Sequence, residues 1–179
     1  MHRIMIIDDE ENILSSLTRI LKKEKDFEVV SHTNPHAALA VANREEFHLF
    51  LSDYRMPSMD GVELLTRTKT FNPHAMRLII SGAADFNALI GAINQAEIYR
   101  FIPKPIQVQE LLQTLKQALH THDLIQENRR LSSLVQKQQN ELAQRANALK
   151  QFAEQHPTLV NVQWEEDGSI IIDQGEIES

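Results

Sequence analysis

The chain has 179 residues, of which 42% are hydrophobic and 24% charged, and its net charge is −7. This composition is that of a soluble globular protein, and the length allows one sizeable core with an appendage but excludes two large domains. The absence of cysteine excludes both a disulfide framework and a thiolate metal site.

Charged residues are unevenly distributed along the chain. Residues 157–179 contain six acidic residues and no Lys or Arg, so the remaining residues carry a net charge of only −1. With no strongly basic region, we expect no nucleic-acid binding. No charged segment followed by a long apolar stretch opens the chain, and no apolar run approaches the roughly 18 residues of a membrane helix. We therefore expect a cytoplasmic protein with no membrane partner.

Five short apolar stretches, the candidate strands, alternate with amphipathic stretches through residue 105. The candidate strands are residues 4–7, 27–30, 49–51, 78–80 and 98–102. Apolar residues recur at helical spacing within residues 13–21, 37–42, 62–65 and 89–93. Asn34-Pro35 and Asp60-Gly61 lie where two of these helices should begin. This alternation predicts an α/β fold, with a doubly wound five-stranded parallel sheet of flavodoxin-like order 2-1-3-4-5 and helices on both faces.

Polar residues follow four of the candidate strands. Asp8 and Asp9 follow the first strand, Asp53 the third, Ser81 the fourth and Lys104 the fifth. An Asp pair alone is more often a helix cap, and a lone Ser is usually a turn residue. Ligands of doubly wound sheets bind outside the carboxyl ends of the strands. The combination of these five side chains at one edge therefore predicts a functional site.

The predicted cluster has the chemistry of phosphoryl transfer. Asp8, Asp9 and Asp53 would repel one another without a cation, and Mg²⁺ binds a few carboxylates together with water and phosphate oxygens. A carboxylate beside such an ion can attack phosphorus and form an acyl phosphate. Lys104 and Ser81 would stabilise the negative charge of the transition state. A cis peptide bond between Lys104 and Pro105 would direct the lysine toward the site.

The segments IIDDEEN, SDYRMPSMDG, IISGAA and YRFIPKP together resemble the receiver domain of two-component response regulators. The resemblance covers residues 1 to about 120, with the signature positions in order. It implies that Asp53 is the phosphoacceptor for a sensor histidine kinase. It also implies that Mg²⁺ is held directly by Asp9, through water by Asp8, by Asp53 and by the backbone carbonyl of Arg55.

The same resemblance assigns residues that respond to phosphorylation. Ser81 corresponds to the switch hydroxyl, and Phe101 to the switch aromatic residue that turns inward. Many relatives have tyrosine at this position; a phenyl ring lacks the hydroxyl, so packing alone should set the two rotamers of Phe101. Arg55 and Ala83 occupy positions at which the family tunes autodephosphorylation.

A long helix is expected after the receiver-like part, because residues 106–156 contain no Gly or Pro. From residue 121, six of the ten a and d positions of one heptad register are apolar, which predicts a homodimeric coiled coil through residues 121–156. Asn128 at an a position favours a parallel pair, whereas Gln138 and Arg145 weaken the middle of the seam. A single solvated helix of this length is the alternative. The ten positions are Thr121, Leu124, Asn128, Leu131, Val135, Gln138, Leu142, Arg145, Leu149 and Phe152.

This helical extension is also similar to that of receivers that precede cyclic-di-GMP hydrolases or cyclases. No such catalytic domain follows in this sequence. His120, His122 and Asp123 include a His-Asp pair but lack the rest of a metal phosphohydrolase signature, so we expect them on a helix surface.

Pro157 should end the long helix, and the tail that follows has a different pattern. Residues 159–164 and 170–172 flank Asp167-Gly168, which predicts a β-hairpin. Because an isolated hairpin is marginal in water, it should pack against its symmetry mate or against a downstream protein partner.

The sequence thus predicts a receiver domain in residues 1–120, a coiled-coil helix in 121–156 and an acidic tail with a hairpin in 157–179. We expect a response regulator, phosphorylated on Asp53 with Mg²⁺, that signals through its dimeric helix. Its enzymatic activity would be limited to its own phosphorylation and dephosphorylation. A constitutive dimeric scaffold and a phosphorelay intermediate are the alternatives.

Overall fold

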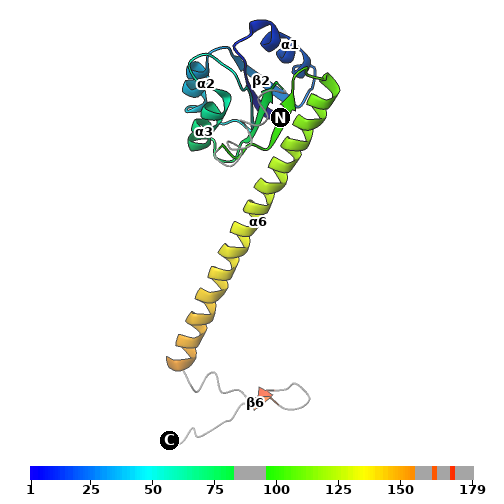
Figure 1. The fold of residues 1–179 in the computed structure, drawn as a ribbon. Helices are drawn as coiled ribbons and strands as arrows, with labels where there is room; N and C mark the ends of the chain where they lie inside the picture. Colours follow the sequence, from blue (N-terminus) through cyan, green and yellow to red (C-terminus); the bar gives the residue numbers. More distant parts are fainter. Residues whose placement is uncertain (83–95, 156–162, 165–169, 172–179) are drawn as a thin grey trace, which may run out of the picture. The chain divides into compact units, whose positions relative to one another are not determined.

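The structure is a computed structural model that describes residues 1–82, 96–155, 163–164 and 170–171 (Figure 1). The chain divides into two units, Met1–Glu127 and Asn128–Ser179. The helix predicted within residues 89–93, Ala83, and the turn predicted at Asp167-Gly168 lie outside the described residues. No helix in the described part of the chain has the length and apolar character needed to cross a bilayer.

The first unit contains a five-stranded parallel sheet of order β2-β1-β3-β4-β5, which confirms the predicted topology. Most strands extend beyond the apolar stretches that predicted them. β5 begins at Arg100, two residues later than expected. The strands are β1 (His2–Ile7), β2 (Phe27–His32), β3 (Leu49–Asp53), β4 (Met76–Ser81) and β5 (Arg100–Pro103).

Both faces of this sheet are covered by helices. Successive strand residues point to opposite faces, and apolar residues at both sets of positions need a covering layer on each side. Ile4 and Ile6 of β1 lie in one apolar cluster with α1 (Glu11–Leu21) and the first part of α6 (Val108–Gln155). Met5 and Ile7 lie in the other cluster, with α2 (Pro35–Ala42) and α3 (Gly61–Phe71). Figure 1 shows α2 and α3 together on one side of the sheet.

The beginnings of α2 and α3 agree with the sequence prediction. The Asn34 side chain accepts hydrogen bonds from the backbone N–H groups of His36 and Ala37, and Pro35 occupies the first helical turn. The Asp60 side chain likewise accepts a hydrogen bond from the backbone N–H of Glu63. Each cap satisfies donors that have no partner within the helix.

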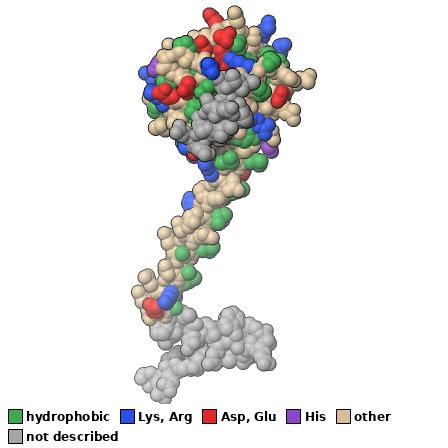
Figure 2. Space-filling view, in the orientation of Figure 1, with side chains coloured by type: hydrophobic (Ala, Val, Ile, Leu, Met, Phe, Trp, Pro, Cys, Tyr) green, Lys and Arg blue, Asp and Glu red, His purple; other side chains and the backbone are tan. Residues whose placement is uncertain are grey.

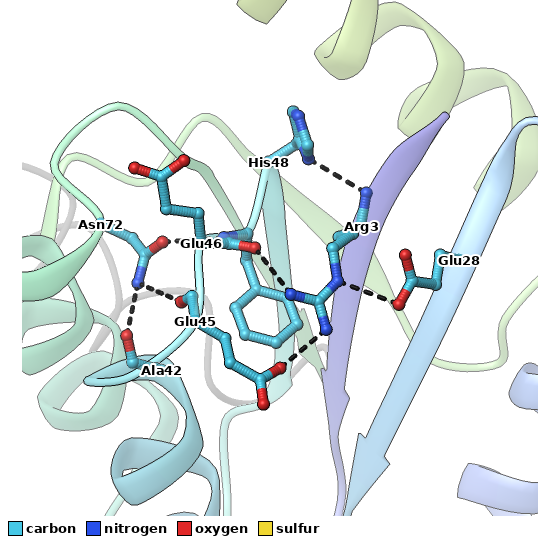
Figure 3. Close-up of polar contacts among 8 residues, drawn as sticks. Arg3, Glu28, Ala42, Glu45, Glu46, His48 and Asn72 are labelled. Atoms are coloured by element: carbon cyan, nitrogen blue, oxygen red, sulfur yellow. Dashed lines mark hydrogen bonds and ion pairs between the residues drawn. The ribbon is translucent and has the colours of Figure 1, made fainter.

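A polar network holds the loop between α2 and β3 at the amino-terminal edge of the sheet (Figure 3). The Arg3 guanidinium pairs with Glu28 at 3.0 Å and with Glu45 at 2.7 Å. The buried Asn72 side chain accepts a hydrogen bond from the backbone N–H of Phe47 and donates to the Ala42 carbonyl. These bonds fix the entry of the chain into β3, at whose other end Asp53 lies.

The helix α6 runs from Val108 to Gln155 and confirms the long helix expected after the receiver-like part. In the first unit, Leu111, Leu115 and Leu119 of this helix are buried in the core. In the second unit, Gln163–Trp164 (β6) pairs antiparallel with Ile170–Ile171 (β7), as the predicted hairpin requires. The predicted domain boundaries at residues 120 and 156 stay predictions.

Candidate functional site

Four strand ends bring polar side chains to the carboxyl edge of the sheet. Asp8 directly follows β1, Asp53 and Ser81 are the last residues of β3 and β4, and Lys104 directly follows β5. Asp8, Asp53 and Ser81 are buried. The backbone N–H of Lys104 donates a 2.8 Å hydrogen bond to the Ser81 carbonyl, which keeps the ends of β4 and β5 in register. The parallel sheet thus assembles, from separate segments, a site that the sequence only implied.

Lys104 is the cation of this site. Its Nζ lies 2.6 Å from Oδ1 of Asp53 and 3.9 Å from Oδ2 of Asp8. Burial lowers the pKa of Lys104, but the hydrogen bond and charge of Asp53, together with the charge of Asp8, raise it by more, so the pKa is raised overall. The lysine therefore stays charged and neutralises part of the carboxylate pair. The cis peptide bond between Lys104 and Pro105 is present, as predicted.

Asp53 is held through both carboxylate oxygens. Oδ1 pairs with Lys104, and Oδ2 accepts a 2.9 Å hydrogen bond from the backbone N–H of Arg55. The next backbone N–H, that of Tyr54, donates to the Ile80 carbonyl of β4. With its side chain 6% exposed, Asp53 is oriented by its surroundings. An oriented carboxylate next to a cation is the arrangement that nucleophilic attack on phosphorus requires.

Asp8 is fully buried, and only one of its two oxygens is satisfied within the described residues. Its Oδ1 accepts a 2.8 Å hydrogen bond from the backbone N–H of Glu10, whereas Oδ2 has no hydrogen-bond partner. The pKa of this carboxyl is raised to about 6: burial is the largest cause and the charge of Asp53 adds to it, whereas the Glu10 hydrogen bond and the charge of Lys104 lower it. A buried carboxylate oxygen without a hydrogen bond is costly, so this atom is suited to bind a cation closer than Lys104, whose Nζ is 3.9 Å away.

The raised pKa of Asp8 predicts that this residue destabilises the metal-free protein at neutral pH. Its ordinary pKa is 3.8 and its folded pKa is about 6, so its contribution to stability is complete below pH 3.8 and is lost as the pH rises through about 6. Asp8→Asn removes this ionisation. We expect it to raise the free energy of unfolding by about 2 kcal/mol near pH 8, and to leave it nearly unchanged near pH 4.

Urea denaturation in the presence of a chelator measures this difference at both pH values. Asp26→Asn is the matched control, because Asp26 is an exposed aspartate outside the site, and it should leave stability within about 0.5 kcal/mol at both. If Asp8→Asn lowered the free energy of unfolding near pH 8, the conclusion that the ionised Asp8 carboxylate destabilises the fold would be wrong.

Asp9 differs from the two buried carboxylates in its exposure to solvent. Its side chain is exposed, and no three His, Cys, Asp or Glu side chains in residues 1–82 and 96–155 are grouped as a metal site. The carboxylates that the structure brings together are therefore Asp8 and Asp53, through Lys104. Their shared negative charge and the Asp8 oxygen that has no hydrogen bond fit a divalent cation of the Mg²⁺ type, which binds carboxylate oxygens and completes its shell with water.

The other predicted site residues occupy neighbouring positions. Ser81 lies at the end of β4, beside β5. Phe101 of β5 is half-buried and packs against the apolar cluster that also contains Ile79. The backbone N–H of Arg55 donates a hydrogen bond to the Asp53 carboxylate.

Gly61 lies directly against the backbone of Asp53, although the sequence predicted only that a helix begins there. Its backbone N–H donates a 2.9 Å hydrogen bond to the Tyr54 carbonyl, which draws the start of α3 against the end of β3. A methyl group at Gly61 would overlap the backbone carbonyl oxygen of Asp53. Only glycine allows this approach. The signal in the sequence was a glycine directly after the capping Asp60, close in the chain to Asp53.

Comparisons with known proteins agree with this geometry. The family model described as the response regulator receiver domain matches residues 4–116. The hydrogenase transcriptional regulatory protein HoxA of Bradyrhizobium diazoefficiens is 36% identical over 124 residues, which cover 69% of this chain and 25% of HoxA. This chain therefore spans only about a quarter of the length of that relative.

Two solved structures show the same fold. The signal receiver domain of an HD domain-containing protein from Pseudomonas fluorescens Pf-5 has a TM-score of 0.64 at 33% identity, covering 68% of this chain and 97% of that one. A structure described as adenylate cyclase from Rhodopirellula baltica has a TM-score of 0.68 at 28% identity, covering 73% of this chain and 96% of that one. With its sheet order, its carboxylate edge and the match over residues 4–116, the chain belongs to the response regulator receiver family of two-component signalling.

Proposed function

We propose that this protein is a response regulator that a sensor histidine kinase phosphorylates on Asp53. The observation that carries the proposal is the trio of Asp53, Lys104 and Asp8, in which an oriented buried carboxylate contacts a lysine at 2.6 Å and lies beside a second buried carboxylate, one oxygen of which has no hydrogen-bond partner. Receiver domains of this family interact with histidine kinases. The chain's membership of the family supports the same type of partner.

Mg²⁺ is the proposed cofactor. Asp8, Asp53 and the backbone carbonyl of Arg55 would hold it, together with Asp9 once the exposed side chain of that residue turns toward the site. The ion supplies positive charge beside the incoming phosphoryl group. Its charge would also stabilise the ionised form of Asp8, whose folded pKa of about 6 marks the cost of burying that carboxylate.

Four side chains have a defined part in the proposed reaction and in the response to it. One oxygen of Asp53 attacks phosphorus, and the bond between phosphorus and the kinase histidine nitrogen breaks, leaving an acyl phosphate. Lys104 exchanges its contact with the Asp53 oxygen for the phosphoryl oxygens and stabilises their charge. The Ser81 hydroxyl donates a hydrogen bond to a phosphoryl oxygen. Phe101, a half-buried ring packed against the apolar core, then follows Ser81 inward.

The proposed output is self-association through α6. Its residues beyond the first unit carry large apolar side chains that are half or more exposed, including Val135 at 50%, Leu142 at 63%, Leu149 at 70% and Phe152 at 50%. Figure 2 shows hydrophobic side chains along this exposed stretch of the helix. All four occupy a or d positions of the predicted heptad register, which supports a coiled coil between two copies of the chain.

The direct test of the proposed function is phosphoryl incorporation. The chain is incubated with acetyl phosphate and Mg²⁺, and the mass of the intact protein is measured. We expect a gain of one phosphoryl group per chain, which a chelator prevents by removing the metal. No gain in mass in the presence of Mg²⁺ would contradict the proposal.

A further inference from the structure

Three histidine rings lie in a row at the amino-terminal edge of the sheet, opposite the carboxylate edge. His2 is the first residue of β1, His48 directly precedes β3, and His122 lies on α6. The ring centroids of His2 and His48 are 5.4 Å apart, and those of His48 and His122 are 5.2 Å apart. All three belong to the first unit of the chain. This histidine cluster therefore joins two strands of the sheet to the long helix.

The cluster lies where α6 leaves the core. His122 is 8% exposed, although the sequence predicted it on a helix surface, and it is the last buried residue of α6. It follows Leu119, the last leucine of this helix that packs in the core. The contacts of His122 therefore hold the final packed turn of α6 in place.

Asp123 supplies negative charge to two of the rings. Its Oδ2 lies 3.0 Å from Nε2 of His2, and its Oδ1 lies 3.2 Å from Nδ1 of His122. Partial burial raises the pKa of Asp123, but the hydrogen bonds and charges of His122 and His2 lower it by more, so the pKa is lowered overall. The carboxylate therefore stays ionised in mildly acidic solution and can balance one imidazolium charge.

The middle ring, that of His48, is fixed in position. The backbone N–H of His48 donates to the Arg3 carbonyl at 2.9 Å, and its carbonyl accepts the Met76 N–H at 2.8 Å. Its ring Nδ1 accepts the backbone N–H of Arg3 at 3.0 Å (Figure 3). A neutral ring that accepts at Nδ1 carries its proton on Nε2, so a second proton must be added at Nδ1. Protonation would then set two donors against each other and break this hydrogen bond.

The charges within the cluster also oppose protonation of His48. Its pKa is lowered from 6.5; burial is the largest cause and the charges of His122 and His2 add to it, whereas the charge of Asp123 opposes it. Three protonated rings would carry more charge than Asp123 balances, and burial leaves that charge weakly screened. Because the unfolded chain takes up this proton more readily, stability is lost as the pH falls below 6.5.

Solvent reaches the cluster, and charged or titratable residues of both signs surround it. A pocket of about 290 Å³ borders His48 and His122, and a second pocket borders His2. The surrounding residues are Glu46 and His74 at the first pocket, Met1, Asp26, Lys116 and His120 at the second, and Arg3 with its partners Glu28 and Glu45.

We propose that the histidine cluster is an acid-sensitive contact, which holds the final packed turn of α6 against the sheet at neutral pH and loosens it when the rings are protonated. Protonation of histidine clusters near pH 5–6 is an established way to change a packed interface. The proposal does not rest on phosphorylation, because Asp53 and Lys104 lie at the opposite edge of the sheet and take no part in it.

The test is hydrogen exchange of the full chain followed by NMR, with a chelator present so that no metal binds the histidines. The opening constant of the backbone amides of residues 119–123 is measured at about pH 7.5 and about pH 5.5. His48→Asn removes the titrating ring, and its amide oxygen can still accept the Arg3 N–H. We expect the ratio of the opening constants, acid over neutral, to be up to about tenfold greater in the unaltered chain than in this variant. The titration of Asp8 is common to both proteins and cancels.

His36→Asn is the matched control, because His36 is an exposed histidine in the first turn of α2. Its ratio should stay within about twofold of that of the unaltered chain. Asp123→Asn removes the balancing carboxylate and leaves His48 in place, so it should increase the ratio at least about threefold. Equal ratios in His48→Asn and the unaltered chain would overturn the proposal. A decrease in Asp123→Asn, or a control that behaves as His48→Asn does, would overturn it as well.

Discussion

Asp53→Asn is expected to abolish phosphoryl incorporation from acetyl phosphate, with no gain in intact mass under conditions that phosphorylate the unaltered chain fully. An amide is a neutral and weak nucleophile, so no acyl phosphate can form. The substitution is nearly isosteric, and the amide oxygen can still accept the backbone N–H of Arg55 that now bonds Asp53 at 2.9 Å. Loss of activity would therefore report on the missing carboxylate rather than on unfolding.

Asp60→Asn is the control for this variant. Asp60 is an exposed aspartate seven positions farther along the chain, and its Oδ1 caps α3 by accepting the Glu63 N–H at 2.8 Å. Because Asn is an equally good N-cap residue, the control should fold and gain one phosphoryl group. Undiminished incorporation in Asp53→Asn would mean that another residue is the acceptor.

Leu142→Gln/Leu149→Gln is expected to convert a dimer into a monomer. Both leucines occupy a positions of the predicted seam and are 63% and 70% exposed in the single chain. Burying a leucine side chain contributes roughly 2 kcal/mol or more, and each leucine is buried in both copies of the coil. Loss of four such side chains should weaken dimerisation at least about 100-fold.

Sedimentation equilibrium measures this change, and circular dichroism should show a parallel loss of helix, because most of the stability of a helix in a protein comes from packing of its apolar face. Leu134→Gln is the control: Leu134 is 45% exposed but lies outside the a and d positions. It should leave the dimer intact. If the double variant were still a dimer, the two chains would associate through another surface.

Much of the fold follows from local patterns in the sequence. Alternation of short apolar strands and amphipathic helices predicts the parallel sheet, and the capping residues Asn34 and Asp60 predict two helix starts to the residue. Strand lengths were less predictable. β4 begins at Met76 and includes Arg77, a buried arginine that donates to the Ala96 carbonyl and pairs with Glu97. A charged residue such as Arg77 interrupts the apolar pattern by which a strand is predicted. Its partners, Ala96 and Glu97, lie about 20 residues away in the sequence, so its burial could not be foreseen.

The candidate site shows the same division. Parallel strand ends share an edge, so the proximity of Asp8, Asp53 and Lys104 could be inferred from sequence. The exposure of Asp9 could not be inferred from sequence. The directions of neighbouring side chains after a strand end depend on the local backbone conformation, which the sequence pattern does not specify. Nor could the role of Gly61, which depends on how closely α3 approaches the Asp53 carbonyl. Tertiary packing decides both.

The central claim is that phosphorylation of Asp53 controls self-association through α6. The most direct test is absolute mass by light scattering behind size exclusion, with Mg²⁺ alone and with Mg²⁺ plus beryllofluoride, which mimics the acyl phosphate. We expect a change in mass or hydrodynamic size on adding the mimic, and no change in Asp53→Asn. A dimer of unchanged size in both conditions would contradict it and favour a constitutive scaffold, and a monomer in both would contradict the predicted coiled coil.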